Sequence, residues 1–219
     1  MNEFLKSRED INAATAWLKE NKFTVHPISA KDWELKIITE ALQDGNLLDM
    51  GADGSRVLHN AVKKGIKGQL VGIDLAEVNG DNKTDGAEYV VGDLMQTPFA
   101  DGSFATLVSQ SVIEHEIDIK KFVAECSRLL MPNGEVIVSF DYWPSKIDTF
   151  HIKLYGLSWC ILDQQDVLGL ILEMDRAGLS LDGEMNWETD KAVINPSYCS
   201  PAPGISYTFG ILKFRKTVN

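Results

Sequence analysis

The sequence predicts an α/β fold in which helices cover both faces of a mainly parallel sheet. Between Gly45 and Trp143, apolar runs of strand length alternate with segments of helical period, and this alternation is typical of a buried parallel sheet. The chain has 219 residues, 44% of them hydrophobic, so it can bury a full core without disulfide bonds. A glycine-containing turn at residues 48–55, LDMGADGS, separates the first predicted strand from the helix that follows it.

The alternating segment contains five predicted strands, at residues 46–50, 70–75, 88–93, 104–109 and 135–140. One helix is expected from Val57 to a Gly65 cap, and another from an Asp118 cap to the turn at residues 131–134. Residues 76–87, between the second and third strands, are polar and rich in Gly and Asn. The crossover helix at that place should therefore be short or missing.

Two regions flank this segment. Residues 1–44 contain two helical patterns with capping-box-like starts at Ser7 and Ser29. We expect them to form a helical cover for the main domain, which comprises residues 45–219. The remaining predicted elements are a helix from Asp163 to Gly178 and a last strand at residues 207–215.

The composition argues against several classes of partner. Asp and Glu number 32 against 21 Lys and Arg, a formal net charge of −11, and this sign repels nucleic-acid phosphates. The N-terminal segment includes Glu9 and Asp10 and has no apolar run of signal-peptide length, and no segment reaches the roughly 18 apolar residues of a membrane span. Three widely spaced cysteines are too few for a disulfide framework. We therefore expect a cytoplasmic protein that binds neither nucleic acid nor membrane.

The glycine turn departs from the dinucleotide-binding pattern G-x-G-x-x-G. Gly51 fits the first position, but Asp53 replaces the second glycine and Arg56 the third. The second glycine allows the backbone to approach a pyrophosphate, and a carboxylate at that place would repel one. A diphosphate ligand is therefore disfavoured.

Acidic residues mark the ends of the first three predicted strands: Asp49 before the glycine turn, Asp74 after the second strand and Asp93 after the third. With the segments around them, they resemble class I S-adenosylmethionine-dependent methyltransferases, most closely the small-molecule, type 11-like group. The resemblance covers roughly Gly45 to Trp143. The segments that carry it, in order, are LLDMGADGS (47–55), VGIDL (71–75), VVGDLMQTPFADGSF (90–104), FATLVSQSVIEHEID (104–118) and SRLLMPNGEVIVSF (127–140).

The resemblance implies a three-layer Rossmann-like sandwich whose sheet has seven strands, mainly parallel, with the last strand antiparallel. It also implies S-adenosyl-L-methionine as cofactor, with Asp74 on the ribose hydroxyls, Asp93 facing the adenine amino group and Leu94 beside the ring. Several carboxylates suit a positively charged sulfonium and a ribose better than they suit a phosphate. The expected cofactor-binding residues are Asp49, Gly51, Ala52, Asp74, Leu75, Asp93, Leu94, Ser109 and Gln110.

Methyl transfer from this cofactor to a small-molecule acceptor, at an oxygen, nitrogen or carbon atom, is the expected activity. Residues 144–206 correspond to the variable acceptor-side region. His115, just past the fourth strand, is the best candidate for a catalytic base, although a histidine bonded near the helix start is an equally good explanation. The acids beside it, Glu114, Glu116 and Asp118, are favoured by the helix dipole alone, so no metal site is expected.

Two other functions stay open from the sequence. One is a nicotinamide-dependent reductase or epimerase on a related nucleotide-binding fold. The other is a non-catalytic module that keeps the fold and the cofactor but transfers nothing, which Asp53 and Ser55 in the glycine turn leave possible. Neither the identity of the acceptor nor the oligomeric state follows from the sequence.

Overall fold

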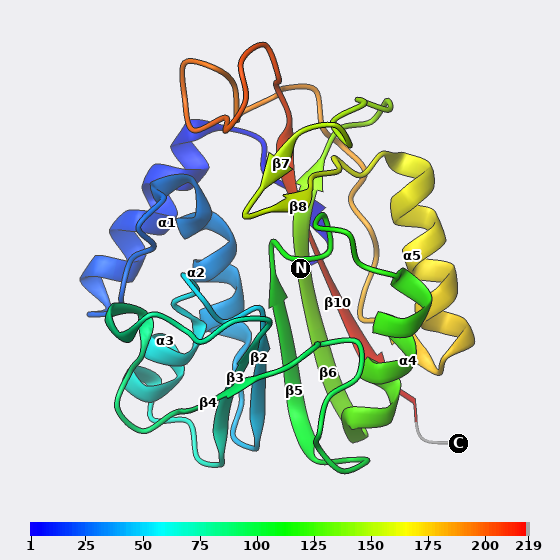
Figure 1. The fold of residues 1–219 in the computed structure, drawn as a ribbon. Coiled ribbons are helices and arrows are strands. Elements are labelled where there is room, and N and C mark those ends of the chain that lie inside the picture. Colours follow the sequence, from blue (N-terminus) through cyan, green and yellow to red (C-terminus); the bar gives the residue numbers. More distant parts are fainter. Residues whose placement is uncertain (218–219) are drawn as a thin grey trace.

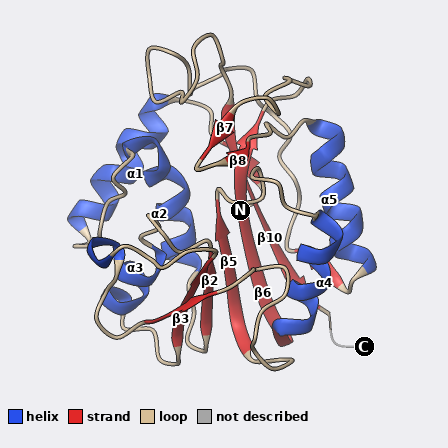
Figure 2. Ribbon diagram, viewed as in Figure 1, coloured by secondary structure: helices blue, strands red, loops and turns tan. Residues whose placement is uncertain are grey.

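A computed structural model describes residues 1–217 and shows helices on both faces of a central sheet (Figures 1 and 2). The helices are α1 (Arg8–Glu20), α2 (Asp32–Ala41) and α3 (Val57–Lys64) on one face, and α4 (Ile119–Leu129) and α5 (Gln164–Arg176) on the other. The predicted α/β sandwich is confirmed. Within residues 1–217, none of the helices has the length and hydropathy needed to cross a bilayer.

The central sheet is mainly parallel. Its strands are β1 (Glu3–Phe4), β2 (Leu47–Met50), β3 (Leu70–Asp74), β4 (Glu88–Val91), β5 (Phe104–Gln110), β6 (Leu130–Tyr142), β9 (Leu179–Leu181) and β10 (Thr208–Lys216). Their order across the sheet is β4-β3-β2-β5-β6-β10, and β1 and β9 both pair with the outer edge of β10. Strands β2 to β6 run parallel, whereas β10 is antiparallel to β6, as expected for the last strand. A separate hairpin consists of β7 (Lys153–Leu154) and β8 (Leu157–Ser158).

The sheet differs from the expected one in two details. It has eight strands rather than seven in the described part of the chain, because Glu3 and Phe4 pair with β10. The N-terminal segment therefore extends the sheet as well as covering it. Strand β6 also begins at Leu130 rather than Glu135, with an irregular stretch where Asn133 has a φ of 62° and the register against β5 shifts.

Most of the predicted helix starts are confirmed. Ser7, Asp118 and Asp163 each accept a backbone N–H at the start of α1, α4 and α5. The cap predicted at Ser29 is wrong, since this residue opens a 3₁₀ turn, η1 (Ser29–Lys31), without a side-chain cap. Asp32 is instead buried and accepts a hydrogen bond from Thr15 Oγ1 at 2.6 Å, which fastens α2 to α1.

Each helical layer packs on its own face of the sheet. Leu47 and Ile137 belong to the apolar cluster under α1, α2 and α3, whereas Leu48 and Val138 belong to the cluster under α4 and α5. This alternation is the two-residue period of a strand buried on both faces. Helices therefore occupy both faces, and the carboxyl edge of the sheet is left to the turns that follow the strands.

The order of the strands creates a switch point at β2. The chain passes from β2 to β3 and β4 on one side, then returns to β5 on the other side of β2. The connection between β3 and β4 holds only a short 3₁₀ turn, η2 (Gly80–Asn82), which confirms the expected lack of a crossover helix there. In open α/β sheets the crevice at such a switch point is where ligands bind.

Candidate cofactor and acceptor site

The glycine turn after β2 touches the turn after β5. Gly51 has a φ of +91°, and its N–H donates to the carbonyl of Ile73 at 2.8 Å. A Cβ at this position would lie 2.4 Å from Cγ2 of Val112, which is far inside van der Waals contact. Both the backbone angle and the close neighbour therefore require glycine, and the two turns form adjoining walls of the crevice.

Asp49 is a buried carboxyl beneath this turn. Its side chain is 1% exposed, and within residues 1–217 its Oδ1 atom has no hydrogen-bond partner. Burial raises the pKa of Asp49 to about 7; the hydroxyl of Ser55 opposes this rise and the nearby Asp74 carboxylate adds to it. An unpaired buried oxygen of this kind is suited to accept a hydrogen bond from a ligand.

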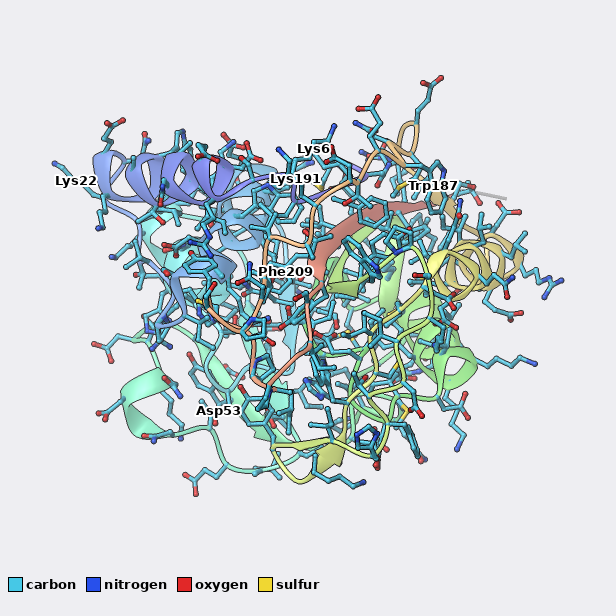
Figure 3. The ribbon with its side chains drawn as sticks, turned by 90° about the horizontal axis from the view of Figure 1, so that it is seen from above. Lys6, Lys22, Asp53, Trp187, Lys191 and Phe209 are labelled. Carbon is cyan, nitrogen blue, oxygen red and sulfur yellow. The ribbon has the colours of Figure 1, made fainter. Side chains whose placement is uncertain are left out.

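Asp74 ends β3 and faces the glycine turn. One of its carboxylate oxygens, Oδ2, accepts the backbone N–H of Asp53 at 2.9 Å. The Asp53 side chain turns towards the loop after β3, where its Oδ1 accepts from Asn82 Nδ2 at 2.8 Å and from the N–H of Asn79 at 3.2 Å. Figure 3 shows Asp53 near the periphery, away from the centrally placed Phe209.

The position of Asp53 changes how the altered glycine turn is interpreted. From the sequence, Asp53 in place of a glycine disfavours a diphosphate ligand and leaves a non-catalytic module open. In the structure its carboxylate instead holds the loop that replaces the missing crossover helix. Arg56 supports the same loop, since its Nη1 donates to Asn82 Oδ1 at 3.0 Å.

The other residues expected around the adenosine are spread unevenly. Leu75 is 58% exposed beside Asp74, so its side chain is open to a ligand. Asp93 is exposed after β4, and its Oδ1 accepts the N–H of Met95 at 2.8 Å, a local turn that leaves the other oxygen at the surface. Leu94 is only 5% exposed and belongs to the core under α4 and α5. The structure therefore places Leu94 in the core, not in the open part of the crevice.

Ala52, Ser109 and Gln110 are also buried, at 2%, 0% and 6% exposure. Ala52 packs over β3, where a Cβ added to Gly72 would lie 2.7 Å from its methyl group. Gln110 ends β5 and its Nε2 donates to Glu34 Oε2 of α2 at 3.3 Å. The end of β5 is thus tied to the N-terminal helices, a connection that the sequence did not reveal.

Glu34 is the centre of that connection. It is fully buried in α2, and its carboxylate accepts hydrogen bonds from the hydroxyls of Ser111 and Ser139, each at 3.1 Å. Ser111 follows β5 and Ser139 lies in β6, so this carboxylate fastens α2 across two strands of the sheet. In the sequence, Glu34 is one polar residue among the apolar positions of α2, and nothing in that pattern indicates this role.

Further acids lie at the ends of β5 and β6 near Lys31. Asp141, 5% exposed, accepts the indole N–H of Trp159 through Oδ2 at 2.7 Å, and Glu114 is 1% exposed. Burial and the neighbouring Asp141 carboxylate raise the pKa of Glu114, and burial likewise raises the pKa of Asp141. Burial alone would lower the pKa of Lys31, but the carboxylates around it, led by Glu34, raise it.

Asp141 could have been found from the sequence, because it occupies the same kind of position as the predicted acids, the carboxyl end of a strand. In the sequence, Glu114 stands out only as part of an acidic run. The structure separates that run: Glu114 is buried, Glu116 pairs with Lys153 at 2.8 Å, and Asp118 caps α4. In the described residues no group of three or more His, Cys, Asp or Glu is arranged to hold a metal ion.

His115 lies between the acids and the β7–β8 hairpin. Its ring meets that of Tyr155 edge-on, with centroids 5.7 Å apart, and its Nδ1 has no partner in the part of the chain that the structure describes. Burial, helped by Lys31, lowers the pKa of His115 to about 4. The imidazole is therefore neutral at pH 7 and has a free nitrogen next to Glu114 in the turn after β5.

Comparison with known proteins agrees with this arrangement. Residues 48–138 match the sequence model of a family described as a methyltransferase domain. The arsenite methyltransferase of Aquipseudomonas alcaligenes is 32% identical over 153 residues, covering 61% of this chain and 44% of the relative. The chain thus spans less than half the length of that curated relative.

Solved structures share the fold. Geranyl diphosphate C-methyltransferase from Streptomyces coelicolor, in complex with S-adenosylhomocysteine, has a TM-score of 0.64 and 14% identity over 88% of this chain and 86% of its own. A 1,6-didemethyltoxoflavin N1-methyltransferase from Burkholderia thailandensis, also with S-adenosylhomocysteine bound, has a TM-score of 0.62 and 15% identity, covering 88% and 80%.

The fold and the switch-point crevice define the class I methyltransferase architecture. Residues 48–138 are similar in sequence to the methyltransferase-domain family, and the fold is similar to that of solved S-adenosylmethionine-dependent methyltransferases. The resemblance drawn from the sequence is confirmed, and both solved structures described above contain S-adenosylhomocysteine.

Proposed function

We propose that this protein transfers a methyl group from S-adenosylmethionine to a small organic molecule. The donor would lie at the carboxyl ends of β2, β3 and β4, and the acceptor at the ends of β5 and β6. The observation that carries the proposal is the pair of carboxyls at the switch point: Asp49, whose buried Oδ1 has no partner in the part of the chain that the structure describes, and Asp74 at the mouth of the crevice. These residues fit the cofactor, because its ribose donates hydrogen bonds and its sulfonium is positive.

The bound cofactor supplies an activated methyl group with a neutral leaving group. The chain's own contribution is alignment, since placing the acceptor in line with the methyl carbon lowers the entropic part of the barrier. The contact between Gly51 and Val112 fixes the turns on either side of the crevice relative to each other. The β7–β8 hairpin, held to Glu116 by Lys153 and the N–H of Ser158, would screen the acceptor side from water.

The acceptor is proposed to be neither nucleic acid nor arsenite. The net charge of −11 opposes a phosphate backbone. Soft arsenic would require grouped thiolates, whereas Cys126 is buried in α4, Cys160 is half-buried beyond β8 and Cys199 is exposed near the C-terminal strand. These free cysteines fit the reducing, cytoplasmic compartment that we propose for the protein.

Binding and turnover can be tested separately. We expect S-adenosylhomocysteine to bind saturably in a calorimetric titration and NADH or NADPH to give no heat. Incubation with methyl-labelled S-adenosylmethionine and a metabolite extract should then yield labelled product. Nicotinamide binding without any response to S-adenosylhomocysteine would overturn the proposal. Affinity for the cofactor without labelled product across such extracts would favour a non-catalytic binding module.

Replacing Asp74 with alanine should weaken S-adenosylhomocysteine binding by about 1.5–3 kcal/mol, because a charge-assisted hydrogen bond to the ribose is lost. The exposed Asp85, in the loop before β4, offers a matched control: Asp85→Ala removes the same charge and should leave the affinity within about twofold, because an exposed charge outside the site is screened. Calorimetry on both folded variants checks this, and equal affinities would reject the ribose role of Asp74.

Replacing Asp49 with asparagine should change how stability depends on pH. The folded-state pKa of Asp49 is raised to about 7, above the usual value near 4 in an unfolded chain. Between these values the folded protein holds a proton that the unfolded chain has lost, so stability falls as the pH rises. An asparagine amide does not titrate. The free energy of unfolding of the variant, relative to that of wild type, should therefore rise by about 2–4 kcal/mol when the pH is raised from about 4 to about 8. Urea unfolding at both pH values measures this, and parallel pH profiles would contradict it.

Replacing His115 with alanine should slow methyl transfer at least tenfold, since a positioned base contributes about 10²-fold or more when the acceptor must lose a proton. The affinity for S-adenosylhomocysteine should change by less than threefold. Labelled-methyl transfer and calorimetry give the two values. Unchanged turnover would remove His115 from the catalytic groups.

A further inference from the structure

Three buried oxygen atoms at the ends of β5 and β6 have no hydrogen-bond partner within residues 1–217. They are Glu114 Oε2, Asp141 Oδ1 and Gln110 Oε1, on side chains that are 1%, 5% and 6% exposed. Buried polar atoms of this kind are uncommon because each forfeits its hydrogen bonds to water. We call these three residues the acid–amide cluster. When both acids are ionised, all three free atoms are acceptors, so a ligand that satisfies them then must donate hydrogens.

The neighbours of the cluster do not supply those hydrogens. Glu34, beside it, is already occupied by the two serine hydroxyls and by the amide nitrogen of Gln110. The Lys31 ammonium is attracted by these carboxylates, yet in the described chain it forms no ion pair within 4.0 Å; it lies 4.8 Å above the ring of Phe209. The indole of Trp159 serves only Oδ2 of Asp141.

The charge of this region also lacks compensation. Among the described residues, Glu34, Glu114 and Asp141 face a single cation, Lys31, so the region is short of positive charge whenever its acids are ionised. An unpaired buried carboxylate is costly because its charge is uncompensated and its hydrogen bonds to water are lost. A cation that also donates hydrogen bonds offsets both costs. An alcohol supplies one donor and no charge, whereas an ammonium ion supplies up to three donors and one positive charge.

We propose that the acid–amide cluster is the acceptor subsite and that it takes an amine, bound as its ammonium ion. The inference rests on the proposed function and names the acceptor class for it. Asp141 and Glu114 hold the charged nitrogen, and the Gln110 carbonyl accepts a further N–H. The indole of Trp159, whose N–H is bonded to Asp141, provides aromatic surface beside the subsite.

The chemistry at this subsite balances. The bound ammonium gives a proton to the carboxylate of Asp141, which frees the nitrogen lone pair. That lone pair forms the new N–C bond to the methyl carbon while the C–S bond breaks, and the sulfur keeps the bonding electrons as the neutral thioether of S-adenosylhomocysteine. The product is the N-methylated ammonium ion, so the total charge is unchanged. Burial raises the pKa of Asp141, so for an amine acceptor this carboxylate takes the proton, whereas the tenfold loss expected for His115→Ala applies to an acceptor that gives its proton to the imidazole.

Matched probes test the acceptor class. Protein saturated with S-adenosylhomocysteine is titrated with phenethylamine and with 2-phenylethanol, which differ only in the ammonium and hydroxyl groups. We expect the amine to bind at least tenfold more tightly than the alcohol. Asp141→Asn and Glu114→Gln should each reduce this ratio below threefold. Glu173→Gln, which removes a half-buried acid of α5 that pairs with Arg176, should leave it unchanged.

The outcomes are separable. If S-adenosylhomocysteine itself fails to bind, the proposed function fails and the amine subsite with it. The amine subsite alone is overturned if S-adenosylhomocysteine binds but 2-phenylethanol binds as tightly as phenethylamine, or if neither probe binds. It is also overturned if the preference for the amine survives in both folded variants, Asp141→Asn and Glu114→Gln. Thermal unfolding of each variant establishes that it is folded. With S-adenosylmethionine in place of the product, mass spectrometry should detect N-methylphenethylamine and no methyl ether of 2-phenylethanol; the reverse result also overturns the inference.

Discussion

Replacing Glu34 with alanine is expected to destabilise the protein by about 2–4 kcal/mol, because buried donors that lose their acceptor keep the full cost of leaving water. Three side chains would be affected at once: Ser111 and Ser139 would each lose a carboxylate partner at 3.1 Å, and Gln110 one at 3.3 Å. These groups lie on β5, on β6 and in the turn after β5. The substitution would therefore loosen α2 from the edge of the sheet that carries the site.

Urea unfolding at neutral pH measures the loss, and two variants serve as controls. Glu34→Gln keeps an acceptor oxygen and should recover at least half of the lost stability. Glu40→Ala removes an exposed acid from the same helix, where it forms a surface pair with Lys36, and should cost about 1 kcal/mol or less. If Glu34→Ala and Glu40→Ala were equally stable, α2 would not depend on this buried carboxylate.

Replacing Gly51 with alanine is expected to cost about 2–5 kcal/mol of stability and to weaken S-adenosylhomocysteine binding at least thirtyfold. Two effects add here. A side chain at a φ of +91° strains the backbone by about 1–2 kcal/mol, and a Cβ placed 2.4 Å from Val112 Cγ2 forces overpacking worth about 1–3 kcal/mol. Relief of the collision requires the turns after β2 and β5 to move apart, which widens the crevice.

Gly54 provides a control in the same turn. It has a φ of +80°, but a Cβ there meets no atom of the described chain within 4 Å, so Gly54→Ala should show the backbone cost alone. A Gly51→Ala, Val112→Ala double variant should recover the part of the loss that comes from the collision. Urea unfolding and calorimetry on the three variants separate the two effects. If Gly51→Ala and Gly54→Ala behaved alike, close contact between the two turns would be excluded.

The fold was predictable because its determinants are local. The alternation of strand and helix patterns predicted the sheet. Because parallel strands end on the same side of a sheet, the positions of Asp49, Asp74 and Asp93 at strand ends predicted that these acids share one edge. Asp118 and Asp163 identified helix starts through their capping preference. Strand β1 was not predictable, because two residues show no period and their pairing with β10 joins opposite ends of the chain.

The acceptor side was much less predictable, because it depends on packing between distant elements. Glu34 meets Ser139 across 105 positions of sequence, and nothing local distinguishes it from a solvated helix residue. Asp53 illustrates the same limit: its place in the glycine turn does not reveal that its carboxylate accepts a hydrogen bond from Asn82 in the loop after β3. Leu94, itself expected beside the adenine ring, belongs to the core under α4 and α5, and sequence spacing does not determine which way this side chain points.

The structure of the protein in complex with S-adenosylhomocysteine tests the donor site most directly. We expect its ribose hydroxyls on the carboxylate of Asp74 and its sulfur above the Gly51 turn, directed towards the ends of β5 and β6. Well-ordered S-adenosylhomocysteine bound elsewhere, or a folded protein that takes up none of it with the Asp49 and Asp74 carboxyls turned away from the crevice, would contradict the proposed donor site.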